Sequence, residues 1–316
     1  MTETVSGYTF RPADLNAAAR RPGIGAFMRI RNGADFLERT ILSHIDFFDE
    51  IVAVHNQCTD ATPDILARLQ QAYGAKLRVF HYTDRVFPPG SEGHAATPPE
   101  TPSSMVNYSN FALAMTTTRT VTKLDDDHLA IGGAVSAVVA DLRKRGGAGN
   151  DMLSFSGINL IARPAVGLAI PKQDPLSGNG DIGFFDVTDD TQFTHDRRFE
   201  RVPRPAGERR FCGFLYWHLK YLKSGLGFAN YELAENKDSR FARRKERLET
   251  AGEMLSLPDL RRSLQPGLRM HAEALLGDKK RIALARARSF SASFPDDTLE
   301  AALRRTVSLE FLAGIV

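Results

Sequence analysis

The feature that most constrains the fold is a regular alternation of two hydrophobic patterns near the start of the chain. Short apolar segments at residues 24–30, 50–54 and 76–82 have the length and the β-branched content of buried strands. Between them, residues 35–48 and 63–73 place apolar side chains three and four positions apart, which is the spacing of one helical face. This order predicts βαβ units, a parallel sheet and therefore an α/β fold class.

Polar residues follow the first two of these predicted strands. Arg29 and Arg31 lie at the end of the first strand, His55 and Asn56 follow the second, and Asp60 lies in the turn beyond it. Open parallel sheets bind ligands at the carboxyl ends of their strands. We therefore expect these five side chains near a ligand site.

The stretch VTKLDDDHLA, residues 121–130, brings three adjacent carboxylates to the end of another predicted strand. Asp125 and Asp127 are two positions apart, so extended backbone would point both to one side and Asp126 to the other. Two carboxylates, completed by waters and a bound phosphate, suffice to hold Mg²⁺ or Mn²⁺. A solvated acidic turn is the alternative and the commoner origin of such clusters. Here the three carboxylates lie at a strand end in a parallel-sheet pattern, where ligands bind, and this position favours the cation site.

The later part of the chain is less regular. Residues 84–104 are rich in proline and glycine and are predicted as a functional or mobile loop. Residues 164–210 are predicted as loops around a site, and residues 211–228 are compatible with a strand or a helix. At the start of the second predicted helix, Thr62 before Pro63 predicts an N-cap.

The order of motifs over residues 24–145 resembles the start of the family 2-type glycosyltransferases, which have the GT-A fold. That family opens with a strand ending in Arg-Asn, a helix, a second strand and a Ser/Thr-Asp-x-Thr turn. Here Arg31-Asn32 and residues 59–62 occupy those places. The family continues with an Asn-containing helix and a strand ending in Leu-Asp-x-Asp-Asp, which correspond here to Asn110 and to residues 124–127.

The resemblance implies a Rossmann-like, mostly parallel central sheet flanked by helices, with a helical C-terminal appendage. It implies a polar leader over 1–22, a catalytic domain over 23–235 and a helical region over 236–316. Within the catalytic domain, 23–150 would bind the nucleotide-sugar and 151–235 the acceptor.

By the same resemblance, the protein would be an inverting glycosyltransferase that uses Mn²⁺ or Mg²⁺ and serves bacterial surface polysaccharide synthesis. The acceptor would be a glycan or a lipid-linked saccharide. The residues expected at the nucleotide-sugar donor are Arg29, Arg31, Asn56, Asp60, Asn110, Asp125 and Lys220. The residues expected at the metal are Asp125, Asp127 and His218.

The sequence also departs from the family pattern. His55-Asn56 replaces the usual acidic residue after the second strand, so the donor nucleotide stays open among UDP, GDP, dTDP and CMP. The Gln-x-x-Arg-Trp signature of processive synthases is absent, which favours single transfer.

An inverting transfer also needs a carboxylate that accepts the proton of the attacking hydroxyl. Asp181 is the first candidate, because flanking glycines let backbone and substrate approach closely. The alternatives are Asp189, Asp190 and Glu200, and each could equally be an ordinary loop acid.

A histidine from the second half often completes the metal site in GT-A enzymes. His218 and His195 both qualify, and His218 is preferred, with Lys220 as a phosphate partner. A buried structural histidine is the alternative for each. For the neighbouring Tyr216 and Trp217, core packing is a commoner role than stacking on a sugar.

Composition narrows the class further. The 41 basic and 38 acidic residues give a net charge of +3, too balanced to indicate nucleic-acid binding. Two cysteines, Cys58 and Cys212, cannot form a disulfide framework. No signal peptide and no apolar run of about 20 residues is visible, so a cytoplasmic protein is expected.

Two other interpretations remain. The arginine-rich C-terminal helices either wrap the catalytic domain or contact an anionic membrane surface peripherally. The function could be that of a nucleotidyltransferase acting on a sugar phosphate, or of a non-catalytic sugar-binding domain. A nucleotidyltransferase would normally show a glycine-rich triphosphate loop, for which RIRNGADF is a poor match.

Overall fold

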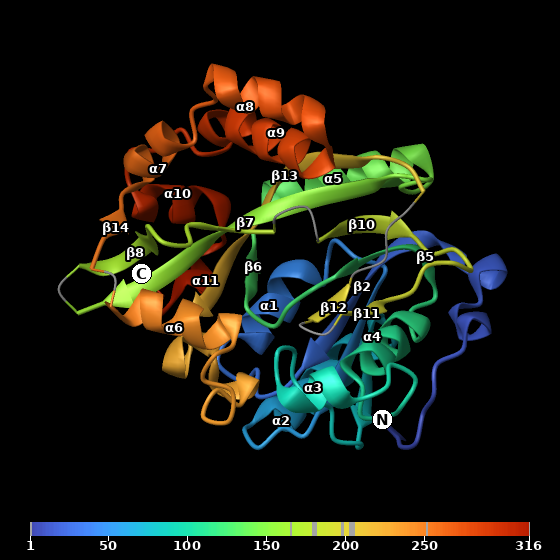
Figure 1. The fold of residues 1–316 in the computed structure, drawn as a ribbon. Helices are drawn as coiled ribbons and strands as arrows, with labels where there is room; N and C mark the ends of the chain where they lie inside the picture. Colours follow the sequence, from blue (N-terminus) through green and yellow to red (C-terminus); the bar gives the residue numbers. More distant parts are fainter. Residues whose placement is uncertain are drawn as a thin grey trace.

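A computed structural model describes residues 2–164, 166–178, 182–196, 199–201, 206–250 and 252–315. The chain forms one mixed α/β structure around a central twelve-stranded sheet (Figure 1). The predicted α/β class with a mostly parallel central sheet flanked by helices is confirmed.

The strands of the described residues are β1 (Glu3–Val5), β2 (Arg21–Ile30), β3 (Glu50–Asn56), β4 (Leu77–Tyr82), β5 (Thr118–Lys123), β6 (His128–Ala130), β7 (Met152–Arg163), β8 (Gly167–Pro171), β9 (Leu176–Ser177), β10 (Gly183–Asp186), β11 (Thr194–Asp196), β12 (Phe199–Arg201), β13 (Arg209–Tyr221) and β14 (Met254–Leu255).

The α-helices are α1 (Leu37–His44), α2 (Thr62–Tyr73), α3 (Glu92–Ala96), α4 (Met105–Ala114), α5 (Gly132–Arg145), α6 (Arg240–Thr250), α7 (Leu257–Ser263), α8 (Leu268–Glu273), α9 (Asp278–Ser293), α10 (Leu299–Thr306) and α11 (Leu309–Leu312).

The sheet joins a parallel half to a mixed half. Its main strand order is β1-β4-β3-β2-β5-β10-β7-β13-β6, and every pair from β1 to β5 is parallel. Beyond β5, strand β10 pairs antiparallel on both sides, β7 and β13 pair in parallel, and β6 closes the edge antiparallel to β13. The carboxyl ends of β2, β3 and β5 therefore lie beside one another.

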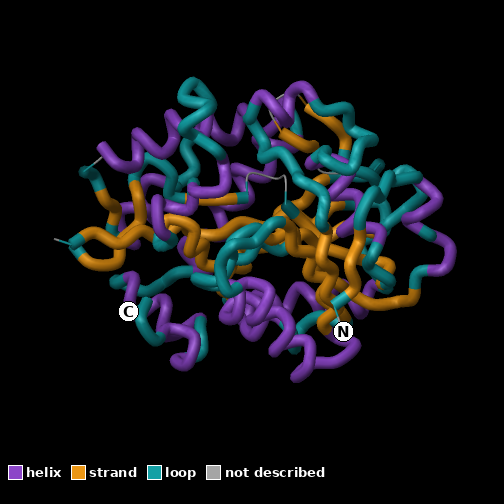
Figure 2. Tube along the Cα trace, turned by 90° about the horizontal axis from the view of Figure 1, so that it is seen from below, coloured by secondary structure: helices purple, strands orange, loops and turns teal. Residues whose placement is uncertain are grey.

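Helices cover both faces of this sheet. Figure 2 shows the strands as a central layer with helices on either side. One buried cluster packs α1, α2 and α5 against β2 and β3 through residues such as Ile41, Leu66 and Val139. On the opposite face, α4 packs through Phe111 against Phe27 and Val52. Burial of both faces explains why the parallel strands read as continuous apolar runs.

The C-terminal helices share a core with the second half of the sheet. Leu257, Phe290 and Leu303, from α7, α9 and α10, pack in one buried cluster with Ile158 of β7 and Trp217 of β13. The indole nitrogen of Trp217 donates to Thr306 Oγ1 at 2.9 Å, which ties α10 to the strand. Core packing is thus the role of Trp217.

The structure corrects two local expectations and settles one that was open. Helix α2 begins at Thr62 itself, so Ala61 is the N-cap residue, and Thr62 N donates to Asp60 Oδ1 at 3.0 Å. The ambiguous segment 211–228 is mostly the long strand β13. The expected loops at 164–210 contain five short strands, β8 to β12.

The fold makes a prediction about strand β13. Phe290 is fully buried on α9, with ring centroids 5.3 Å from Phe214 of β13 and 5.2 Å from Phe294. We expect Phe290→Ala to lower the free energy of unfolding by roughly 3 to 5 kcal/mol, because it opens a cavity beneath the strand.

Urea unfolding monitored by circular dichroism measures this loss. Leu268→Ala is the matched control, since Leu268 is 93% exposed and its truncation should stay within about 0.5 kcal/mol of wild type. Equal stability of the two variants would contradict the packing described for α9.

Candidate functional site

A cleft of about 840 Å³ opens at the carboxyl ends of the parallel strands. Arg29 and Ile30 at the end of β2, Asn56 at the end of β3, and Lys123 at the end of β5 all line it. Its other wall comes from the second half of the chain, including β12, β13 and α6. The structure therefore has a cleft at the position where the sequence predicts a ligand site.

The lining of this cleft is predominantly basic. Four acidic side chains, Asp125, Asp126, Asp127 and Glu200, face ten basic ones. The basic residues are Arg29, Arg31, Lys123, Arg201, Arg209, Lys220, Lys223, Arg240, Arg244 and Lys279. An enclosed excess of one charge focuses the field within the cleft, so this one favours an anionic ligand.

Strand register builds the floor of the cleft. His128 of β6 lies directly opposite His218 of β13, and His218 lies opposite Asn159 of β7. Directly opposed side chains on paired strands are close neighbours on one sheet face. Asp127 immediately precedes β6, and its carbonyl accepts from Leu219 N at 2.8 Å, which fixes the turn against β13.

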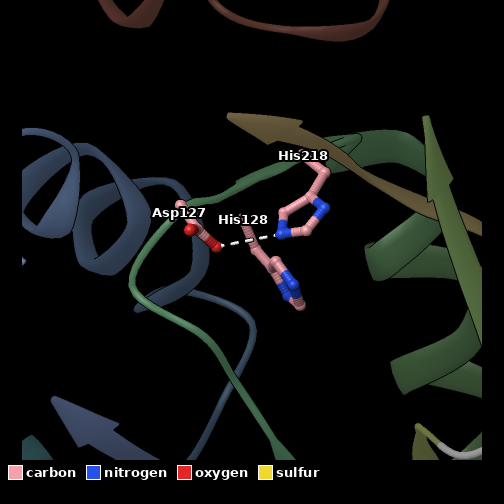
Figure 3. A group of neighbouring side chains, drawn as sticks. All are labelled: Asp127, His128 and His218. Atoms are coloured by element: carbon pink, nitrogen blue, oxygen red, sulfur yellow. Dashed lines mark ion pairs between the residues drawn. The ribbon is translucent and has the colours of Figure 1, made fainter. Parts of the chain in front are cut away.

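Three nitrogen or oxygen donors converge at this floor. Asp127, His128 and His218 each offer a ligand atom, and these atoms lie within 4.8 Å of one another (Figure 3). His218 Nε2 is 3.2 Å from Asp127 Oδ1. Within the described part of the chain, neither Asp127 Oδ1 nor His128 Nε2 has a hydrogen-bond partner, although both are buried. Buried lone pairs without a donor are what a cation satisfies.

Hydrogen bonding sets the tautomer of His218. The side-chain amide of Asn159 donates to the carbonyl of Asp174 at 2.7 Å and to its Oδ2 at 3.1 Å. Asn159 Oδ1 is therefore the acceptor, and His218 Nδ1, 2.6 Å away, donates to it. The other ring nitrogen, Nε2, faces Asp127 and is the atom placed to hold a cation. A metal-binding histidine usually donates its other ring N–H to a protein acceptor in this way, and the hydrogen bond fixes the orientation of the ring.

A proton on His218 Nε2 would give Asp127 Oδ1 a hydrogen-bond donor, but His128 Nε2 would still lack a partner among the described residues. Burial lowers the pKa of His128 to about 3, so this imidazole is neutral near pH 7. Its ring stacks on Tyr216 with centroids 3.7 Å apart, which holds it in place. A donor set of one carboxylate oxygen and two imidazole nitrogens fits Mn²⁺ or a similar borderline cation.

Lys223 connects two of the three carboxylates. Its ammonium nitrogen lies 2.9 Å from both Asp126 Oδ2 and Asp127 Oδ2. Burial alone would raise the pKa of Asp127, but the adjacent Lys223 ammonium outweighs burial and holds it well below its usual value. Burial raises the pKa of Asp126 to about 6 despite the same lysine. The two carboxylates thus share one neutralising ammonium.

The expected division of the acidic triplet is wrong. Residues 126 and 127 lie in a turn, so the alternation of extended backbone does not apply, and Asp126 joins Asp127 on Lys223. Asp125 is instead the separate member, paired with Lys123 and 3.7 Å from His128 Nε2. Asp126 also explains Gly33, where a Cβ would come within 2.3 Å of Asp126 Oδ2.

The structure brings most of the expected donor residues to the cleft. Arg29, Arg31, Asn56, Asp125 and Lys220 all line it. Arg29 pairs with Glu200 at 2.7 Å, and Arg31 lies 3.5 Å from Glu232. Asn56 donates at 2.7 Å to the carbonyls of Tyr82 and Asp84. The ammonium of Lys220 lies 4.7 Å from the ring centres of Phe228 and Tyr231.

Two expected donor residues lie elsewhere. Asp60 is exposed outside the cleft lining, and its carboxylate accepts from Ala34 N and Thr62 N at 3.0 Å each. Asn110 is buried in α4, where its amide accepts from Phe193 N at 2.7 Å and donates to Phe193 O at 3.1 Å. Each of these side chains fixes a loop, and neither lines the described cleft.

The structure distinguishes among the four candidate bases and between the two candidate histidines. Asp181 lies outside the described residues. Asp189 and Asp190 are exposed in a turn and do not line the described cleft. Burial alone would raise the pKa of Glu200, but Arg29 outweighs burial and lowers it, which makes Glu200 a weak base. His195 stacks near His94 in the β11 region and does not belong to the histidine–aspartate cluster.

Sequence reasoning missed three residues of the site. His128 follows the acidic triplet directly, and its adjacency to a candidate metal ligand was an available signal. Asn159 and Lys223 have no local signal, because a register between distant segments brings Asn159 to His218 and the chain after β13 brings Lys223 to the acids.

Comparison with known proteins gives partial likenesses to solved structures. No protein-family model matches the sequence, and no curated protein matches it. Glucosyl-3-phosphoglycerate synthase from Mycobacterium tuberculosis, with Mg²⁺ and UDP, matches at 19% identity and a TM-score of 0.27. The match covers 50% of this chain and 51% of the synthase, so the chain spans about half the length of that protein.

A second likeness extends over more of the chain. TarS residues 1–349 from S. aureus, in complex with UDP, match at 11% identity with a TM-score of 0.30. This match covers 90% of the chain and 83% of the TarS fragment.

The geometry of the floor makes a prediction about Asn159. We expect Asn159→Leu to weaken Mn²⁺ binding by about 10- to 100-fold, because His218 loses the partner that fixes its tautomer and orientation. Electron paramagnetic resonance of free and bound Mn²⁺ measures the affinity directly, without any assay of activity.

His195→Ala is the matched control, and it should bind Mn²⁺ as the wild type does, because His195 lies outside the cluster. Unchanged Mn²⁺ affinity in Asn159→Leu, with a native circular dichroism spectrum, would refute the role assigned to the Asn159–His218 hydrogen bond.

Proposed function

We propose that the protein is a GT-A-type, metal-dependent glycosyltransferase that moves a sugar from a nucleotide-sugar donor to a glycan or lipid-linked acceptor. The observation that carries the proposal is the cluster of Asp127, His128 and His218 on the floor of a basic cleft at the ends of parallel strands. The motif order over residues 24–145 supports the same family.

In this proposal Asp127 and His218 hold Mn²⁺ or Mg²⁺, with His128 as a third donor and Asp125 on the nucleotide side. When bound, such an ion neutralises charge on the donor diphosphate and makes it a better leaving group. Asn159 keeps His218 oriented, and Lys223 balances the charge of Asp126 and Asp127.

The basic side chains of the cleft bind the anionic part of the donor. Lys220 is the most suitable for a phosphate, because its cation rests against two aromatic rings and its ammonium donates only to Tyr231 Oη, at 3.2 Å, among the hydrogen bonds described. Arg31 and Asn56 lie at the ends of β2 and β3, where the nucleotide of a parallel-sheet protein binds. Arg29 is held by Glu200 and contributes charge at the same edge.

Transfer requires that the acceptor oxygen attack the anomeric carbon while the bond from that carbon to the phosphate oxygen breaks. The hydroxyl proton passes to a carboxylate, for which we propose Asp181. Its chain neighbour Ile182 lines the cleft, and Asp189, Asp190 and Glu200 are less suited for the reasons given above.

We further propose that the acceptor belongs to bacterial surface polysaccharide or glycolipid synthesis, and that the protein acts at the inner face of a membrane. The basic, partly apolar C-terminal helices support this part of the proposal.

The experiment that tests this function is turnover of a panel of UDP-, GDP-, dTDP- and CMP-sugars with Mn²⁺ or Mg²⁺. We expect release of a nucleoside diphosphate from one donor class, and loss of that release with EDTA. Asp127→Asn should lower the rate at least about a hundredfold, because the variant loses the charge that holds the cation.

Asp189→Asn is the matched control and should retain full turnover, since Asp189 is exposed away from the cleft. Full activity of Asp127→Asn would overturn the metal assignment. Pyrophosphate as the product would show nucleotidyl transfer, and the absence of any nucleotide binding would favour the non-catalytic interpretation.

A further inference from the structure

An exposed apolar surface lies on the C-terminal helices. Leu268 at the start of α8 is 93% exposed, and Leu275 and Leu276 in the short 3-10 helix η6 (Ala274–Leu276) are 86% and 80% exposed. Among the described residues the other exposed large apolar side chains, Val166 and Leu309, stand singly. Figure 1 shows α8 and the start of α9 at the outer edge of the molecule.

Basic residues flank these leucines along the chain. Residues 268–281 contain four basic residues, Arg269, Lys279, Lys280 and Arg281, against the two acids Glu273 and Asp278. Glu273 pairs with Arg269 and with Lys280, at 2.7 Å each. Lys279 is exposed and forms no ion pair with any described residue. Exposed leucines within a basic segment are characteristic of protein surfaces that insert into the headgroup region of anionic bilayers.

A second copy of the chain is a poorer occupant of the same surface. A symmetric contact would place the same patch of both copies face to face. The lysines and arginines beside the leucines would then oppose one another, which costs free energy that an anionic bilayer would instead supply.

We propose that this leucine surface, made of Leu268, Leu275 and Leu276 with Arg269, Lys279 and Lys280, docks on an anionic lipid bilayer. No helix of the described residues has the length and apolar character needed to cross a membrane. The attachment is therefore peripheral for this part of the chain, with the leucines in the headgroup region and the basic side chains on lipid phosphates.

One basic residue belongs both to the leucine surface and to the cleft. Lys279 lines the cleft and follows Leu276 by three residues. We infer that a bilayer bound to the leucines lies near the wall that Lys279 forms. This second step rests on the function proposed above: the acceptor is a lipid-linked saccharide whose phosphate passes Lys279 as its sugar enters the cleft.

The docking is tested by co-sedimentation of the full chain with sucrose-loaded vesicles of phosphatidylcholine, with and without phosphatidylglycerol. We expect binding to the anionic vesicles, weakened by salt. The triple variant Leu268→Ser, Leu275→Ser, Leu276→Ser should lower the partition coefficient by about tenfold or more. The double variant Val166→Ser, Leu309→Ser removes exposed apolar surface elsewhere and should bind as the wild type does.

Absence of binding to anionic vesicles, or equal binding by the triple-serine variant, would overturn the proposal. A wild-type dimer in light scattering that the triple variant abolishes would assign the surface to a second copy. Thermal shift with UDP and Mn²⁺ separates this test from that of the function. Loss of docking with nucleotide binding intact refutes the membrane surface alone, and docking without nucleotide binding refutes the proposed function alone.

Discussion

The site depends on one register, in which β6, β13 and β7 place His128, His218 and Asn159 side by side. A slip of one residue along β13 would turn His218 to the other face and bring Trp217, which is fully buried in the core, to the site. The core contacts of Trp217 with α10 therefore also hold His218 in place. In this way the C-terminal helices, which contribute only Lys279, Arg240, Phe241 and Arg244 to the cleft, help to position its floor.

The parallel half of the fold could be predicted because its signals are local. Buried strands and one-faced helices alternate within about eighty residues, and each pattern is complete within its own segment. Strand β13 lacks such a signal, because both faces carry aromatic or long side chains and its partners β6 and β7 are distant in sequence. Only tertiary pairing decides that residues 211–221 form a strand.

The site residues show the same difference between local signals and contacts of distant segments. Asp127 and His218 could be named from motif and residue type, whereas Lys223 and Asn159 are defined by contacts between distant segments. Asp60 and Asn110 occupy motif positions but do not line the described cleft. A polar residue at the position of a family motif can fix the loop that supports a site, as Asp60 does by accepting from Ala34 N and Asn110 by accepting from Phe193 N. A sequence motif does not distinguish these two roles.

The charge pattern of the cleft follows from these contacts. Its floor gathers three carboxylates whose nearest cations are Lys123 and Lys223, and its walls carry the remaining basic side chains. Acids concentrated at the floor favour a cation there, and basic walls favour an anion above it. Neither ligand alone balances the cleft, since the cation would add to the excess positive charge and the anion would face the carboxylates. A cation and an anion bound together satisfy both parts, which is the arrangement that a metal–diphosphate pair provides.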